Sequence, residues 1–399
     1  MKHPLFITKD GKSYFSPFVL VTSLFFLWGF AHSILDVLNK HFQSHLDVSK
    51  AESGLVQTMV YGGYFLMALP AGWIIKKWGY RIGVVTGLLL YGIGALMFIP
   101  GEQLMSFPFF LFSLFVIGCG LTCLETSANP YITILGKPED GARRLNLAQS
   151  FNGLGWIMGP MVGSLLILDD DSQLALPYTV VGSIVLLLGV VFARLNLPIP
   201  NVEQSTTSNE NIAHEKSFNK LFWFGAMALF LYVAAQTGIN SFFINYVTEI
   251  EPTISAQLAG LILSFGGMSL LLIGRLVGSS LMKYTSPSSM LAICALASII
   301  CMIMVVCEFN IFSLIALCAV YLFESIMFPT IFAMALYQAE TNKERASSIL
   351  IMCIVGGAIS PILMGYIGQT NMAIGFTIPL ICFIGIFIYA ITNMKLRYM

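Results

Sequence analysis

The sequence predicts an all-α membrane protein whose twelve transmembrane helices form two six-helix bundles. Of the 399 residues, 57% are hydrophobic and 10% are charged, and the mean hydropathy is +0.83. These values lie far outside the range of soluble globular domains. Twelve runs are apolar and long enough to span a bilayer, which takes about 20 residues per helix. The two halves also share an arrangement of glutamate and proline, which indicates an internal duplication.

The individual spans follow from the apolar runs between charged residues and turn residues. The first run begins only after Pro17 and is followed by no cleavage site of small residues, so it is predicted to be a retained span and not a signal peptide. The predicted spans are residues 18–38, 54–75, 81–99, 108–135, 147–168, 177–195, 221–248, 256–282, 289–307, 311–338, 346–367 and 373–394.

The longest polar stretch divides the chain near its middle. Residues 196–220 are rich in Ser, Thr, Asn and Glu, a composition typical of a flexible linker. The predicted organisation is therefore an N-terminal six-helix bundle over residues 1–195, a cytoplasmic linker over 196–220 and a C-terminal six-helix bundle over 221–399.

The distribution of lysine and arginine predicts the orientation in the membrane. If every run crosses once, only Lys40 and Lys50 fall opposite the side of the N-terminus, apart from Arg275 inside a span. Short cytoplasmic loops carry the positive excess, so both termini are expected to be cytoplasmic in a multi-pass protein of a bacterial inner membrane. The formal net charge of zero hides this asymmetry, and no nucleic-acid partner is expected.

Three carboxylates lie within apolar runs. Glu125-Thr-Ser-Ala-Asn-Pro130 in the fourth span matches Glu324-Ser-Ile-Met-Phe-Pro329 in the tenth, and Asp36 lies in the first. A charged residue at bilayer depth costs about 2.5 to 3.5 kcal/mol on insertion scales, so such residues usually face a cavity or a partner. The sequence therefore indicates a transporter in which Asp36, Glu125 and Glu324 are candidates for proton coupling.

Uncharged polar residues share helical faces with these carboxylates, as a water-lined cavity requires. Amides and phenols both donate and accept hydrogen bonds, which suits a polyhydroxylated substrate, although interhelical bonding remains an alternative for each. The candidate substrate-binding residues, together with Glu125, are Gln57, Tyr61, Tyr64, Asn129, Gln149, Asn152, Gln236 and Asn240.

The sequence predicts neither a cofactor nor a metal site. Cys119 and Cys123 are one helical turn apart, but no His or further Cys joins them at metal-site spacing. The Gly-Lys-Ser at residues 11–13 lacks the upstream glycine of a phosphate-binding loop. A membrane-embedded enzyme or sensor is retained as a remote alternative, without an appended catalytic domain or a His-rich motif to support it.

Several motifs carry a resemblance to a known family. They are Phe25-Phe-Leu-Trp-Gly29, Cys123-Leu-Glu-Thr-Ser-Ala-Asn-Pro130, Leu145-Asn-Leu-Ala-Gln-Ser-Phe-Asn152, Ser325-Ile-Met-Phe-Pro-Thr-Ile-Phe332 and Val355-Gly-Gly-Ala-Ile359. Together they resemble the fucose permease and glucose/galactose transporter family of the major facilitator superfamily. The resemblance implies that superfamily's fold, a monomer, alternating access and proton-coupled uptake of a neutral monosaccharide. Sodium-coupled transport and export of sugars or drugs remain alternatives.

The resemblance also assigns roles to particular residues. Asp36 matches the family's protonatable aspartate, Glu125 its glutamate in the fourth helix and Asn152 a sugar-site amide. Residues 72–81 resemble the superfamily's cytoplasmic gating loop, whose matching residues here are Gly72, Lys76, Lys77, Gly79 and Arg81.

Two positions leave the choice of sugar open. Gln236 matches the fucose-type members of the family, whereas Asn245 is more similar to the glucose/galactose type. Glu324 has no counterpart among the family's motifs, and its predicted role depends on the internal repeat. If a pseudo-two-fold axis relates the halves, Glu324 faces the same cavity as Glu125, and the two carboxylates are expected to titrate together.

Overall fold

The computed structural model describes residues 14–135, 141–168, 174–195, 218–282, 284–339 and 343–397, and every regular element in these ranges is helical. The helices of the first half are α1 (Phe15–His45), α2 (Lys50–Ser53), α3 (Leu55–Leu96), α4 (Phe98–Leu104), α5 (Phe107–Ile134), α6 (Gly141–Leu166) and α7 (Ala175–Arg194). The predicted linker, residues 196–220, lies almost entirely outside the described residues.

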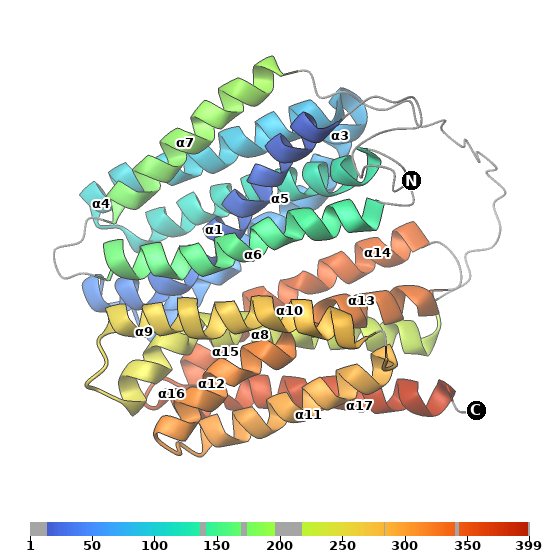
Figure 1. Ribbon diagram of the computed structural model, residues 1–399. Helices are drawn as coiled ribbons and strands as arrows, with labels where there is room; N and C mark the ends of the chain where they lie inside the picture. The colour runs from blue at the N-terminus through green and yellow to red at the C-terminus, as the bar shows by residue number, and fades with distance from the viewer. Residues whose placement is uncertain are drawn as a thin grey trace.

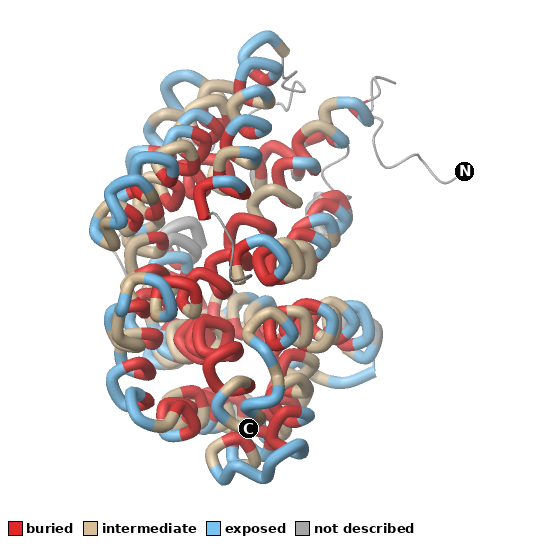
Figure 2. The backbone as a smooth tube through the Cα atoms, turned by 90° about the vertical axis from the view of Figure 1, so that its left-hand side faces the viewer, coloured by how far each residue is buried: buried red, intermediate tan, exposed pale blue. Residues whose placement is uncertain are grey.

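The helices of the second half are shorter because several spans are interrupted. They are α8 (Lys220–Ile250), α9 (Ala256–Ile262), the π-helix η2 (Leu263–Met268), α10 (Ser269–Leu281), α11 (Pro287–Val306), α12 (Ile311–Glu324), α13 (Met327–Gln338), α14 (Lys343–Met352), the 3₁₀ helix η3 (Cys353–Val355), α15 (Gly356–Ile367), α16 (Met372–Gly375) and α17 (Thr377–Arg397). In Figure 1 the helices α1 to α7 form an upper group and α8 to α17 a lower one. Figure 2 shows buried residues gathered inside each group and where the groups meet.

The lengths of the helices confirm the predicted spans. Ten segments of the described chain are long and apolar enough to cross a membrane. One of them, Lys50–Leu104, has 55 residues, and at about 1.5 Å per residue it is too long for a hydrocarbon core of about 30 Å. Gly79 divides it, with φ 82° and ψ 170° inside α3, so this segment contains the predicted second and third spans. With α6 as the fifth span, the predicted twelve are accounted for.

Glycine allows close contact between α1 and α6. A Cβ atom on Gly155 would lie 2.3 Å from the carbonyl oxygen of Phe26, and one on Gly159 would lie 1.9 Å from Ser33 Oγ. Real side chains do not approach so closely, so a larger residue at either position would push the two helices apart. This packing fixes the helix that carries Asp36 against the helix that carries Gln149 and Asn152.

Breaks in the second half fall near the middle of three spans. The π-helix η2 interrupts the eighth span, residues 325 and 326 separate α12 from α13 in the tenth, and η3 precedes α15 in the eleventh. Such interruptions are frequent at functional sites, and in transporters they concentrate near the substrate path. They identify the centre of the second half as a place to search for polar function.

Candidate functional site

Asp36 is buried where α1 meets α3. Its side chain is 2% exposed, and Oδ1 accepts a hydrogen bond of 3.0 Å from Gln57 Nε2. Oδ2 has no hydrogen-bond partner. The predicted residues Asp36 and Gln57 therefore form a pair, in which one carboxylate oxygen is free to bind a proton or a donor.

Glu125 on α5 lies at the end of a short polar chain. Its carboxylate interacts through hydrogen bonds with Tyr64 and Asn129, and the Tyr64 hydroxyl also lies 2.9 Å from His32 Nε2. His32 is four residues from Asp36 along α1, but the structure places its ring against Tyr64. The chain from His32 through Tyr64 connects α1 to the carboxylate on α5.

Aromatic rings surround His32 on several sides. The imidazole stacks on Trp156, with ring centroids 6.1 Å apart and planes 12° apart, and further rings come from Trp28, Tyr61 and Tyr64 at centroid distances of 6.4, 5.9 and 5.4 Å. Flat aromatic surfaces beside polar groups suit a ligand with one apolar face and several hydroxyls. Trp156 and His32 also belong to the site. They were not among the candidate residues predicted from the sequence.

Tyr61 connects the two groups of helices. Its hydroxyl lies 3.2 Å from Thr237 Oγ1 on α8, and it interacts electrostatically with both Asp36 and Glu125. Tyr61 is therefore within electrostatic reach of both carboxylates of the first half and also contacts the second half. Thr237 directly follows the predicted site residue Gln236, but adjacent residues of a helix do not face the same side, so helical spacing did not identify it.

The second half holds a separate set of polar residues. Glu324 is fully buried at the end of α12, and its neighbours include Gln236 on α8 and Arg275 on α10. Asn240, the other predicted residue of α8, accepts a hydrogen bond of 2.8 Å from the Tyr321 hydroxyl. Thus Gln236 and Asn240 face α10 and α12, on the side of Glu324.

The two predicted amides of α6 have different surroundings. Gln149 lines a cavity, whereas Asn152 is 5% exposed and donates a 3.1 Å hydrogen bond to the carbonyl oxygen of Phe25 on α1. In this conformation Asn152 therefore joins two helices. Its spacing of three residues from Gln149 does not bring both side chains to the same surface.

The cavity lies between α6 and the second group of helices and measures about 930 Å³. From the first group it is lined by Gln149 and Ser150, and from the second by Arg275, Ser325 and Pro329 among others. Arg275, the basic residue inside a predicted span, therefore lies on the wall of this cavity. The cavity also touches Leu221, in the first turn of α8, so it reaches the end of the molecule where that helix begins.

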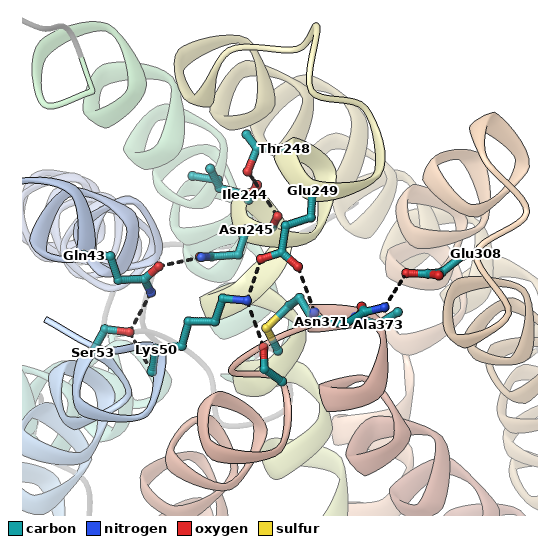
Figure 3. A network of polar contacts seen from close by, with 12 residues as sticks. Gln43, Lys50, Ser53, Ile244, Asn245, Thr248, Glu249, Glu308, Asn371 and Ala373 are labelled. Carbon is teal, nitrogen blue, oxygen red and sulfur yellow. Dashed lines mark hydrogen bonds and ion pairs between the residues drawn. The ribbon is translucent and has the colours of Figure 1, made fainter. Parts of the chain in front are cut away.

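The opposite end of the molecule is closed by polar contacts between the two groups (Figure 3). Lys50 Nζ lies 2.6 Å from Glu249 Oε1 and donates a 2.8 Å hydrogen bond to the carbonyl oxygen of Gly368. Glu249 Oε2 in turn accepts a hydrogen bond from the backbone N–H of Met372. Glu249 is in the last turn of α8, so this contact and the cavity lie at opposite ends of one helix.

Backbone contact seals the same end. A Cβ atom on Gly365 would lie 2.3 Å from the carbonyl oxygen of Lys50, and one on Gly54 would lie 2.7 Å from the backbone nitrogen of Ile362. Asn245 donates to Gln43 Oε1 nearby. Asn245, the residue of the glucose/galactose type, therefore belongs to this closure and does not line the cavity in this conformation.

The residues of the predicted gating loop lie in the turn within α3. Gly79 supplies the positive φ of 82°, a conformation that costs other residues free energy. Lys77 Nζ lies 4.8 Å from the ring centroids of both Trp73 and Trp78, within reach of a cation–π interaction. These aromatic contacts were not predicted. The other residues of the predicted gating loop are Gly72, Lys76 and Arg81.

The spanning helices and the polar residues buried between two groups of them define a multi-pass membrane protein with a central polar site. Residues 21–361 match the model of the Major Facilitator Superfamily. The chain is 33% identical to a glucose/galactose transporter of Brucella abortus, covering 97% of this chain and 96% of that protein. It is 35% identical to the L-fucose-proton symporter of Escherichia coli, covering 96% and 94%.

A solved structure agrees with these relatives. A crystal structure of a Major Facilitator Superfamily transporter, FucP, in the outward conformation is 35% identical, covers 95% of this chain and 99% of that chain, and superposes with a TM-score of 0.66. The chain therefore belongs to the fucose and glucose/galactose transporter family of the Major Facilitator Superfamily. The family resemblance predicted from the motifs is confirmed.

Proposed function

We propose that this protein is a secondary active transporter that takes up a neutral sugar together with protons by alternating access. The observation that carries the proposal is the polar network around Asp36 and Glu125, in which amides and phenols from α3 and α5 and the Thr237 hydroxyl of α8 surround a buried and a half-buried carboxylate. Relatives named as an L-fucose-proton symporter and a glucose/galactose transporter, matched over nearly their full length, support it.

The chemistry of the site favours a neutral polyhydroxylated ring. Amide and phenol groups match sugar hydroxyls as donors and acceptors, and the rings around His32 offer a surface for the apolar face of a sugar. Arg275 is the one cationic side chain among the described cavity-lining residues, and Glu324 lies close to it. The substrate is L-fucose, or glucose and galactose.

A counterflow assay tests the substrate class. Proteoliposomes loaded with L-fucose, galactose, glucose or an organic anion are diluted into radiolabelled solute, and transient accumulation reports exchange. Accumulation of one or more neutral sugars is expected. Uptake of the organic anion, with no response to any neutral sugar, would refute the proposal.

Residues 1–195 and 221–399 act as the two moving bundles, joined by the linker 196–220, and both termini are cytoplasmic. In that orientation the Lys50 end faces the periplasm and the cavity opens to the cytoplasm, which is the inward-facing state. Transport then requires the contacts of Lys50, Gly365 and Gly54 to separate while the cavity closes.

The ion pair at the closed end predicts an effect on this equilibrium. Glu249→Gln removes the Lys50 ion pair and weakens acceptance from the Met372 N–H. The Glu249 side chain is 35% exposed, so the pair is worth only about 1 kcal/mol, or roughly a fivefold shift toward the outward-facing state. Hydrogen exchange of the peptides around residues 50–54 and 364–373 should become faster.

The matched control for this experiment is Glu251→Gln, because Glu251 lies two residues away and its side chain accepts a hydrogen bond from the Thr253 hydroxyl within the same loop. It should leave exchange in both peptides unchanged. Equal protection in Glu249→Gln and the wild type would show that the ion pair does not hold this end closed.

Asn152→Ala is expected to weaken sugar affinity about fivefold without changing the pH dependence of uptake. The substitution removes the hydrogen bond to Phe25, which is worth about 1 kcal/mol, and loosens α1 beside the aromatic rings around His32. Affinities and pH profiles of uptake measure both effects. A shifted pH profile at unchanged affinity would contradict this role and would place Asn152 among the proton-coupling residues.

A further inference from the structure

Glu324 has an unusual environment for a carboxyl group. It is 0% exposed, and neither Oε1 nor Oε2 has a hydrogen-bond partner of standard geometry, although Gln236 lies close by. The hydroxyl of Tyr232, its neighbour on α8, is also without a partner. A buried carboxylate with no donor is costly, so Glu324 is suited to carry a proton in this conformation.

The break in the tenth span places Glu324 at a helix end. Pro329 has no N–H to donate to the carbonyl oxygen of Ser325, four residues earlier, and α12 stops at Glu324 while α13 starts at Met327. Carbonyl groups at the C-terminal end of a helix carry partial negative charge. They disfavour a second negative charge at Glu324, and they can accept a hydrogen bond from its protonated form.

The cavity provides a path by which the proton can leave. Ser325, in the break, and Pro329, in the first turn of α13, line the cavity together with Arg275. A Cβ atom on Gly274 would lie 2.4 Å from Ser325 Oγ, so α10 packs directly against the break and brings Arg275 beside it. Glu324 itself does not line the cavity of about 930 Å³, but the residue that follows it, Ser325, does.

Few charged groups face this carboxyl. Among the described residues, the titratable groups that interact with it are Arg275 from α10, Tyr232 from α8 and Tyr321 from its own helix. Tyr321 is also within electrostatic reach of Asp36, and its hydroxyl donates to Asn240. Arg275 is the one cation of this set and can stabilise the carboxylate once the proton has left.

We propose that Glu324 is a second proton-binding site of the transport cycle, separate from Asp36 and Glu125, and that it releases its proton into the cavity beside Arg275. In this step the O–H bond of the Glu324 carboxyl breaks, a cavity water accepts the proton, and the carboxylate that remains is neutralised by the Arg275 guanidinium. The inference rests on the proposed function: the Glu324 proton accompanies each sugar in addition to the proton bound at Asp36 and Glu125, and it is transported only while that pair exchanges its own proton.

Infrared spectroscopy of the purified protein tests the binding of this proton without any sugar. In an Asp36→Asn/Glu125→Gln background, the spectrum at neutral pH should retain the C=O band of a buried protonated carboxyl, and Glu324→Gln should remove it. Glu251→Gln in the same background should leave the band intact. Absence of the band before Glu324 is changed, or its persistence in Glu324→Gln, would overturn the proposal.

Sugar accumulation tests the coupling of this proton. Glu324→Gln loses no hydrogen bond of standard geometry, so it should fold and exchange sugar by counterflow. At a gradient of one pH unit each coupled proton contributes about tenfold to the accumulation ratio, so the variant should accumulate about tenfold less sugar than the wild type. An unchanged ratio would contradict the proposal. Failure of the wild type to exchange sugar would refute the proposed function but would leave the infrared result standing.

Discussion

Glu125→Gln should abolish accumulation driven by a pH gradient while sugar exchange continues. Glutamine has the size of glutamate and can still contact Tyr64 and Asn129, but it cannot take up or release a proton. The carrier would then behave as if permanently protonated, and the accumulation ratio should fall to about one, a loss of at least tenfold at one pH unit. Uptake with and without a pH gradient, compared with counterflow, measures this effect.

The control for this variant is Glu102→Gln, since Glu102 on α4 accepts a hydrogen bond from the backbone N–H of Ala175 at the start of α7 and takes no part in the polar network around Glu125. It should accumulate sugar as the wild type does. Full accumulation in Glu125→Gln would remove Glu125 from the coupling machinery.

Asp36→Asn is expected to have an effect of similar size. The amide oxygen of asparagine can still accept the hydrogen bond from Gln57 Nε2, so the contact between α1 and α3 survives. The second carboxylate oxygen, which has no partner, is replaced by a group that cannot ionise. Exchange should therefore persist, and net transport should no longer follow the proton gradient.

Asp47→Asn provides the comparison, because Asp47 is exposed in the loop after α1 with φ 50°, a conformation that asparagine also tolerates. Its accumulation ratio should match that of the wild type. If Asp36→Asn accumulated sugar equally well, Asp36 would have a structural role only.

The sequence predicted the spans well because their signal is local. Length and hydropathy alone placed all twelve, and the ends agree to within a few residues for helices such as α8 and α11. The positions where spans break were harder to predict. Pro329 signals the break after Glu324, whereas the π-helix η2 contains no proline and depends on packing against α6 and the Tyr321 ring.

The sequence predicted which residues belong to the candidate site better than it predicted which residues they contact. Helical spacing placed Gln57, Tyr61 and Tyr64 on one face, and the structure joins them to Asp36, Thr237 and Glu125 respectively. Those partners come from other helices, and a period along one helix does not reveal which neighbour it faces. This limit also explains why Asn152 was assigned to the sugar site although it contacts Phe25 in this conformation.

Contacts between the two halves of the protein depend on the conformational state. The spacing of residues along the sequence therefore cannot predict them. Lys50 was noted only as an exception to the charge distribution, yet it forms the ion pair with Glu249 that closes one end. Arg275 likewise depends for its role on the cavity that lies between α6 and the second group of helices in this conformation.

The central claim, proton-coupled uptake of a neutral sugar, is tested most directly by recording proton movement when sugar is added. In lightly buffered, energy-depleted cells that express the protein, addition of L-fucose, galactose or glucose should make the external medium more alkaline in step with uptake of labelled sugar. A protonophore should abolish the pH change, and Asp36→Asn and Glu125→Gln should lack it. Sugar uptake without any proton movement, or uptake that requires sodium, would contradict the account.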